Sequence, residues 1–154
     1  MIVRDAVSSD SDALAAMIRG LALHEGMTAQ IRFQPRDVQA ALSGPDPRLR
    51  AFVAERDGRL LGFVSFTVDY SIWENGQIVR VDDVFVDAAA RRDGVGTKLM
   101  LHLAAFACAQ GMSARWELET ENARAQKFYE RLGAKVRPKK IAHWALADMR
   151  RVIS

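Results

Sequence analysis

The chain has 154 residues, of which 49% are hydrophobic and 27% charged, as expected for one globular domain spanning residues 1–154. It contains no apolar run long enough to span a membrane, and its N-terminal "MIVRDAVSSDSD" lacks the apolar region of a signal peptide. A single cysteine excludes an internal disulfide framework and favours a reducing compartment, so we expect a cytoplasmic protein.

The charged residues argue against two further classes of partner. The net charge is +3, but the basic residues are scattered and form no patch of the kind that binds a nucleic-acid backbone. The three histidines have no metal-ligand spacing with the cysteine, so we expect no metal site. An anionic small ligand remains compatible with the composition.

The first part of the chain predicts a strand followed by two helices. Residues 2–6 have the pattern of a short strand. Residues 8–25 have helical spacing, and Ser9 with Asp12 forms a capping-box pattern at the start of this helix. A second short helix begins at Pro35, a residue favoured in the first turn of a helix.

The middle of the chain predicts three antiparallel strands. Asp57-Gly58 is a tight-turn dipeptide within residues 51–70, so this run is expected to form a hairpin. Asn75-Gly76 is a second such turn, and it leads into a third strand over residues 77–87.

The last part of the chain predicts two helices and three strands. A long helix over 94–111 ends near a glycine, and its inward stripe consists of Val95, Leu99, Leu103 and Phe106. A strand at 113–120 follows this crossover and should lie parallel to the strand at 77–87. A helix at 123–133 and strands at 134–137 and 141–146 complete an α/β protein with a mixed, mostly antiparallel sheet flanked by helices.

The segment "RRDGVG" at residues 91–96 has the character of an anion-binding loop. Glycines let backbone N–H groups point at a ligand, and the following helix offers its positive N-terminal end. Leu99 stands where a dinucleotide fingerprint needs a third glycine, and Thr97-Lys98 reverses the order that a Walker A loop needs. By itself this pattern is also compatible with an ordinary loop between a strand and a helix.

Two motifs that follow one another along the chain resemble motifs of the GNAT superfamily of N-acetyltransferases. The strand "VDDVFV" followed by Arg91-x-x-Gly94-x-Gly96 resembles its acetyl-CoA-binding segment, and "ENARAQKFYERLGAKV" resembles a later motif that begins at Asn122 and carries Tyr129. The resemblance implies the acyl-CoA N-acyltransferase fold. It also implies contacts with acetyl-CoA from Val84, Phe85, Val86, Arg91, Arg92, Asp93, Gly94, Val95, Gly96, Thr97, Lys98, Asn122, Ala125 and Tyr129.

Four shorter stretches resemble one branch of that superfamily, the spermidine/spermine and thialysine N-acetyltransferases. They are "LALHEGM", "VDYSIWENG", "VRVDDVFV" and "KFYERLGA", and the likeness extends over residues 14–134. It implies that Glu25, Asp82 and Asp83 bind the amine substrate. Tyr70 and Trp73 line the amine pocket in this interpretation, although packing within the hairpin would explain them equally well.

Acetyl transfer assigns roles to two of these residues. Tyr129 is the candidate general acid, because a phenol can give its proton to the departing thiolate; the alternative is a core residue sharing a helix face with Phe128 and Leu132. Asp82 is the candidate base that takes a proton from the amine. The alternative is that an acid at this position only faces solvent or a partner chain. Since side chains alternate along a strand, Asp82 and Asp83 are expected to face opposite sides.

One residue of this chain departs from the pattern of the polyamine enzymes and bears on the substrate class. Polyamine enzymes of this branch carry a further Asp in "Tyr-x-x-Trp", where this chain has Ser71, so a diamine or thialysine-like amine is favoured over a long polycation. We therefore expect an acetyl-CoA-dependent N-acetyltransferase of small primary amines (a diamine, a polyamine or a thialysine-like amine), acting by direct attack in a ternary complex. The alternatives are a protein lysine or N-terminal acetyltransferase and a catalytically weak acetyl-CoA-binding regulatory module. The resemblance also implies a homodimer, with "IAHWALADMRRVIS" at the interface.

Overall fold

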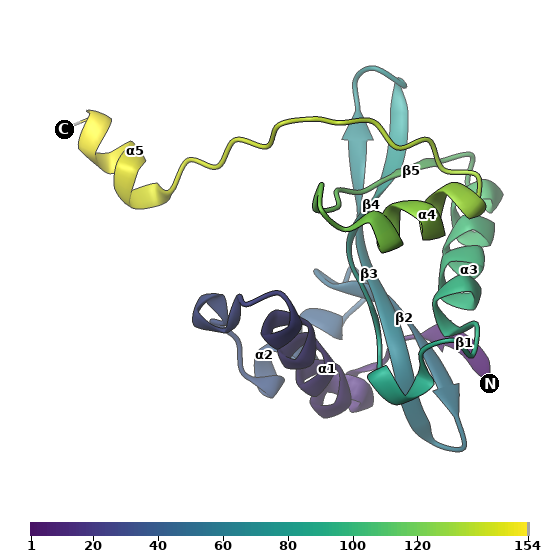
Figure 1. Ribbon diagram of the computed structural model, residues 1–154. Coiled ribbons are helices and arrows are strands. Elements are labelled where there is room, and N and C mark those ends of the chain that lie inside the picture. The colour runs from purple at the N-terminus through teal and green to yellow at the C-terminus, as the bar shows by residue number, and fades with distance from the viewer. Residues whose placement is uncertain (154) are drawn as a thin grey trace. The chain divides into compact units, whose positions relative to one another are not determined.

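The computed structural model describes residues 1–153 and divides into two compact units, one spanning residues 1–117 and one beginning at Leu118 (Figure 1). The single-domain organisation of residues 1–154 stays a prediction. Every helix among residues 1–153 is too short or too polar to span a lipid bilayer.

The first unit contains the whole sheet and most of the helices. Its elements are β1 (Ile2–Asp5), η1 (Ser8–Asp10), α1 (Ser11–His24), η2 (Thr28–Gln30), α2 (Pro35–Leu42), β2 (Arg50–Arg56), β3 (Arg59–Ser71), β4 (Gly76–Val86), η3 (Ala88–Ala90), α3 (Val95–Ala109) and β5 (Ser113–Arg115). The strands form one sheet in the order β1-β2-β3-β4-β5, antiparallel throughout except for the parallel pair β4 and β5. The predicted hairpins and the parallel crossover through α3 are thereby confirmed.

The start of α1 differs from the prediction. The helix begins at Ser11, after a turn of 3-10 helix, and the predicted capping box of Ser9 and Asp12 is wrong. The Asp10 carboxylate instead accepts a hydrogen bond from the Val7 N–H at 2.8 Å and two from the Arg4 guanidinium at 2.7 and 2.9 Å. The Asp10 carboxylate thus closes the 3-10 turn and pairs with a cation from β1, and it makes no capping hydrogen bond to α1 itself.

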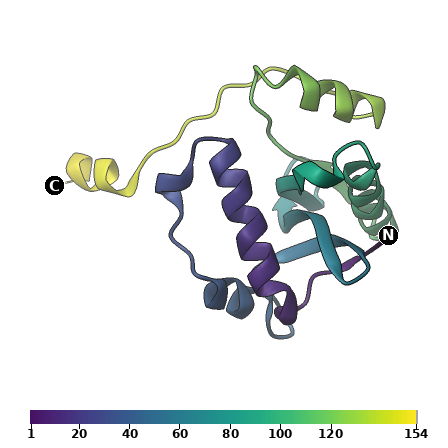
Figure 2. The same cartoon turned by 60° about the horizontal axis from the view of Figure 1, so that its bottom comes forward.

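The two faces of the sheet are covered by different helices, and Figure 2 shows α1 and α3 on opposite sides of it. On what we call the α1 face, Phe63 and Val53 pack with Leu14 of α1. On the α3 face, the ring centroids of Phe52 and Phe66 lie 5.6 and 5.3 Å from that of Phe106 in α3. Alternation along each strand thus divides the sheet side chains between two cores.

Strand β5 is shorter than predicted. Its pairing with β4 covers only Ile78–Arg80 and Ser113–Arg115, whereas a strand was expected over 113–120. The pairing ends two residues before a bulge in β4 at Asp82. A bulge bends and twists its strand, and this accounts for the early separation of the two strands.

The second unit contains α4 (Ala123–Arg131), which confirms the helix predicted at 123–133, and α5 (Leu146–Ile153). The strands predicted at 134–137 and 141–146 are wrong. Neither segment has a ladder partner, and alternating side chains cannot make a strand without one. The helical spacing of Leu146, Met149 and Val152 was the signal for α5 that the sequence interpretation missed.

Candidate active site

A one-residue bulge in β4 lies at Asp82. Ser65 of β3 pairs with Asp83 and the next residue, Phe66, pairs with Val81, so Asp82 is the extra residue. Side chains that would alternate in a regular strand therefore change phase here. The expectation that Asp82 and Asp83 face opposite sides is wrong, because the bulge turns both acids to the same face.

That face is the α1 face. Val81 pairs with Phe66 and shares its side of the sheet, which is the α3 face. Phe85 pairs with Phe63 and packs against the core beneath α1. Asp82 and Asp83 lie between Val81 and Phe85 along β4. The bulge interrupts the alternation of side chains, so both acids lie on the same face as Phe85.

Both acids have carboxyl groups that hold a proton more readily than usual. Burial raises the pKa of Asp82, and the negative charges of Asp83 and Asp69 raise it further, while Arg80 lowers it. Burial also raises the pKa of Asp83, against a lowering by a hydrogen bond from the Ser65 hydroxyl. A carboxylate with a raised pKa is a better proton acceptor, and this is what removing a proton from an ammonium group requires.

The sequence interpretation missed three residues of this face, namely Ser65, Asp69 and Arg80. Asp69 and Arg80 form an ion pair with a nitrogen-to-oxygen distance of 2.8 Å. Each of the three is unremarkable in its local sequence. Only the pairing of β3 with β4 brings them beside Asp82 and Asp83, so no local pattern could have found them.

The edge of β4 that faces β5 is open over its last residues. β4 pairs with β3 as far as Val86, which lies opposite Gly62. On the other edge β5 leaves after Arg80, and no strand among residues 1–153 pairs with Val84, Phe85 or Val86 there. An open strand edge presents main-chain N–H and C=O groups in a row that an extended ligand can join.

The loop that follows β4 leads from this edge to the N-terminus of α3. Gly94 is the residue before the helix and has φ 73°, a left-handed conformation that favours glycine. The Lys98 N–H makes the first intrahelical bond, to Gly94 O at 3.0 Å. Helix geometry leaves the N–H groups of Val95, Gly96 and Thr97 without an intrahelical acceptor. The helix N-terminus thus offers three aligned donors to an anion.

Charged side chains fix this loop to the sheet. The Arg91 Nε donates to Val86 O at 3.3 Å, so this guanidinium is anchored at the end of β4. The Asp93 carboxylate forms an ion pair with Arg56 at 3.2 Å. Arg92 has φ 80°, unusual for a residue with a side chain, and it immediately precedes Asp93 and Gly94. A loop held at both ends can present its N–H groups in a fixed arrangement.

The residues expected from the later motif belong to the second unit. The Asn122 Oδ1 accepts a hydrogen bond from the Ala125 N–H at 3.0 Å and so caps the start of α4. Tyr129 is 8% exposed, and its ring centroid lies 5.0 Å from that of Phe128. Burial raises the pKa of the Tyr129 phenol, which is therefore protonated at neutral pH.

The three other residues expected to bind the amine lie in different surroundings. Glu25 follows the last residue of α1 and is exposed, and its N–H donates to Leu21 O at 3.0 Å. Tyr70 lies near the end of β3 on the α3 face, is 67% exposed and donates its hydroxyl to Asn75 at 2.9 Å. Trp73, in the turn between β3 and β4, is 92% exposed. The strand register thus puts Tyr70 on the face opposite to the two acids.

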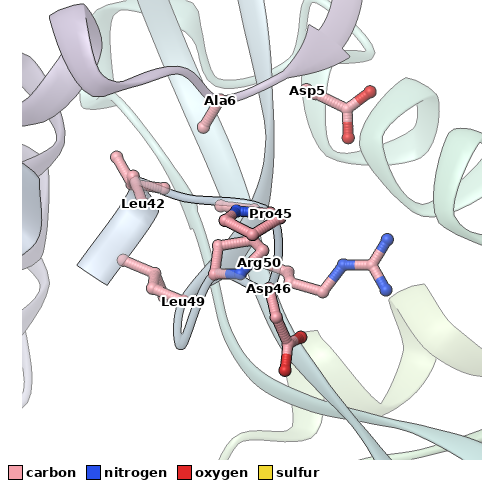
Figure 3. Close-up of a pocket in the computed structure, with 9 residues that line it drawn as sticks. Asp5, Ala6, Leu42, Pro45, Asp46, Leu49 and Arg50 are labelled. Atoms are coloured by element: carbon pink, nitrogen blue, oxygen red, sulfur yellow. The ribbon is translucent and has the colours of Figure 1, made fainter. Parts of the chain in front are cut away.

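A pocket of about 240 Å³ lies away from all of these residues (Figure 3). It is bordered by β1 and by the loop between α2 and β2, and its charged side chains are Asp5, Asp46 and Arg50. No residue of the bulge or of the loop before α3 lines it. Among residues 1–153, no group of three His, Cys, Asp or Glu side chains is placed to hold a metal ion.

An open strand edge, a helix N-terminus with unpaired helical N–H groups and an acidic bulge occur on one strand and the loop after it. The acetyltransferase (GNAT) family model matches this chain over residues 16–134, which include all three features. The chain belongs to the GNAT family of acetyltransferases. The GNAT domain accounts for the mixed sheet with its helices, and the protein is an N-acetyltransferase.

Individual relatives agree with the family. Thialysine N-epsilon-acetyltransferase of Mus musculus is 29% identical over 141 residues, covering 86% of this GNAT chain and 82% of the relative. The protein of the same name from Sus scrofa is 26% identical over 144 residues, covering 88% and 84%. The crystal structure of a possible acetyltransferase from Clostridium difficile 630 superposes with a TM-score of 0.78 at 21% identity, covering 94% of this chain and 97% of that one.

Proposed function

We propose that this N-acetyltransferase transfers the acetyl group of acetyl-CoA to a primary amine of a small molecule, by direct attack in a ternary complex. The observation that carries the proposal is the geometry of β4. One edge of this strand is open and ends at the N-terminus of α3, and one face carries two acids at a bulge. The first feature suits the coenzyme and the second suits a cationic amine.

The coenzyme fits the open edge and the loop. An extended pantetheine arm would bond to the main chain of Val84, Phe85 and Val86 like an added strand. The pyrophosphate would accept hydrogen bonds from the N–H groups at the start of α3, with Arg91 and Arg92 supplying positive charge. The remaining residues in this assignment are Asp93, Gly94, Val95, Gly96, Thr97, Lys98, Asn122, Ala125 and Tyr129. The coenzyme supplies an acetyl group activated as a thioester.

The reaction needs one proton acceptor and one donor. Asp82 would take a proton from the ammonium group, directly or through water, and pass it to solvent. The neutral amine then attacks, the N–C bond forms, and the Val84 N–H stabilises negative charge on the carbonyl oxygen. As the C–S bond breaks, Tyr129 gives its proton to the thiolate. The proton that the new amide nitrogen loses restores the phenol, so the charges balance.

The acids and the relatives support a small cationic substrate. Asp82, Asp83 and Glu25 would attract an ammonium group, and Tyr70 and Trp73 are proposed to line its pocket, although the register separates Tyr70 from the acids. Relatives named thialysine N-epsilon-acetyltransferase support a thialysine-like amine or a diamine. Ser71 occupies the position at which polyamine enzymes have an acid, and this favours a short amine over a long polyamine.

A panel of amines tests this function directly. Purified protein is incubated with acetyl-CoA and with thialysine, lysine, diaminopropane, spermidine or a lysine-containing peptide, and released thiol is measured. We expect release with the short amines. Release with the peptide only would identify a protein acetyltransferase. Tight coenzyme binding without release for any amine would identify a binding module.

Two further features belong to the proposal, a homodimer and a reducing compartment. A homodimer formed through residues 141–154 would cover apolar side chains that the protomer exposes, among them Ile141, Trp144, Val152 and Ile153. A single monomeric mass in solution scattering would contradict it. The exposed thiol of Cys108, the chain's one cysteine, supports a reducing compartment such as the cytoplasm.

A further inference from the structure

Arg80 brings a positive charge to the acidic face of β4. Val81 points to the α3 face with Phe66, so its neighbour Arg80 points to the α1 face, as Asp82 does. The Arg80 Nε donates to the Asp69 carboxylate at 2.8 Å. The two side chains are 49% and 42% exposed, so a small ligand can reach them.

The pair with Asp69 leaves Arg80 with donors to spare. A guanidinium has five N–H donors, and within residues 1–153 the recorded hydrogen bond of Arg80 uses the one on Nε. The four N–H groups on its terminal nitrogens form the fork that binds a carboxylate through two parallel bonds. Asp69 holds the guanidinium in place, and the fork remains available.

The neighbouring charges do not remove this positive charge. Arg115, which lies beside Arg80 on β5, has its own partner in Glu74, at a nitrogen-to-oxygen distance of 3.8 Å. Glu117 also interacts with Arg80 through its charge, but no hydrogen bond joins them. The face therefore carries two acids at the bulge and, two residues along the same strand, an oriented guanidinium.

We propose that Arg80 binds a carboxylate of the amine substrate, so that the enzyme acetylates the side-chain amine of an amino acid in preference to the corresponding diamine. This rests on the proposed function, because Asp82 must receive the reacting amine. Arg80 and Asp82 lie two residues apart on the same face of β4 and interact through their charges, so an amine and a carboxylate at opposite ends of a short lysine-like chain can reach both. A diamine would instead bring its second ammonium group beside Arg80, where like charges repel.

Matched substrates test the proposal. Each amino acid is compared with its decarboxylated counterpart: lysine with cadaverine, and thialysine with bis(2-aminoethyl) sulfide. We expect the wild type to favour the amino acid of each pair in kcat/KM. In Arg80→Gln the preference should fall about tenfold or more, through KM for the amino acid, while kcat changes little. Arg80→Lys, which keeps the charge but not the fork, should restore part of the preference.

Arg115→Gln is the matched control, because it removes one exposed positive charge from the neighbouring strand without touching Arg80. An equal loss of preference in this variant, or no loss in Arg80→Gln, would overturn the role of Arg80. So would a wild type that favours cadaverine over lysine. A wild type that releases no thiol with any amine would instead overturn the proposed function, so the two failures are distinguishable.

Discussion

The proposed coenzyme side and the proposed amine side of the candidate active site share β4 but use different parts of its structure. In this proposal the coenzyme is bound mainly by the main chain, through the open edge of β4 and the N–H groups that begin α3. The amine is proposed to bind and lose its proton at side chains, the acids of the Asp82 bulge. A main-chain site depends on backbone conformation, whereas a side-chain site depends on which face each residue takes. Four substitutions test this contrast.

Tyr129→Phe should have the largest effect. If the Tyr129 phenol protonates the leaving thiolate, the coenzyme side also depends on one side chain, and kcat should fall about 10²–10⁴-fold. The KM values for both substrates should change little, because the phenylalanine ring keeps the packing against Phe128. Steady-state thiol release measures both quantities. Unchanged turnover at saturating substrate would show that Tyr129 is a packing residue only.

Asp82→Asn should affect the amine side alone. The amide cannot accept a proton from the ammonium group, so kcat/KM for the amine should fall about 10²-fold. Binding of acetyl-CoA, measured by titration calorimetry in the absence of amine, should be unchanged. A variant that loses coenzyme affinity as well would contradict the division of the site into two sides.

The same contrast explains what the sequence could predict. The loop at Arg91–Lys98 was predicted because its signals are local: a glycine that takes φ 73°, followed at once by a helix. For the acidic face, the residues were predicted but the side of the sheet on which they lie was not. The resemblance picked out Asp82 and Asp83, but alternation put them on opposite faces, since a bulge arises from the pairing of two strands and has no signature in one of them.

Contacts between residues far apart in the chain could not be predicted from local sequence patterns, because they too depend on how strands and helices pair. Asp69 and Arg80 share a face only through the β3–β4 register. The Asp10 carboxylate, just before α1, is held by Arg4 from β1. The strands predicted at 134–137 and 141–146 failed because alternation specifies a face but supplies no partner strand. The hairpins and the helices α1 to α4, whose turns or hydrogen bonds are local, were predicted, although α1 begins later than expected and α5 was missed.

Gly94→Ala tests the main-chain side. A residue with a side chain costs about 1–2 kcal/mol in the left-handed conformation, and relieving this strain moves the N–H groups that begin α3. We expect KM for acetyl-CoA to rise about tenfold, with KM for the amine unchanged. Gly111→Ala is the matched control, because Gly111 has φ 67° just after the other end of the same helix and an added Cβ would meet no atom within 4 Å. It should lose similar stability in thermal unfolding and keep the wild-type KM.

Asp83→Asn should produce the smallest change, a shift in pH dependence. Asp82 acts as a base only when it is deprotonated, and its raised pKa puts the acid limb of kcat/KM above the usual carboxyl range. The negative charge of Asp83 contributes to that elevation, after burial. Removing the charge should lower the pKa of Asp82, so activity should persist to lower pH than in the wild type. A limb that moves to higher pH, or stays in place, would mean that the negative charge of Asp83 does not raise the pKa of Asp82.

The acid limb of kcat/KM should then be remeasured in Asp69→Asn, since the charge of Asp69 is the next contributor to the raised pKa of Asp82 and lies on the neighbouring strand. Because both substitutions remove like charge, a shared downward shift would identify Asp82 as the titrating base, and the site as one defined by the strand register.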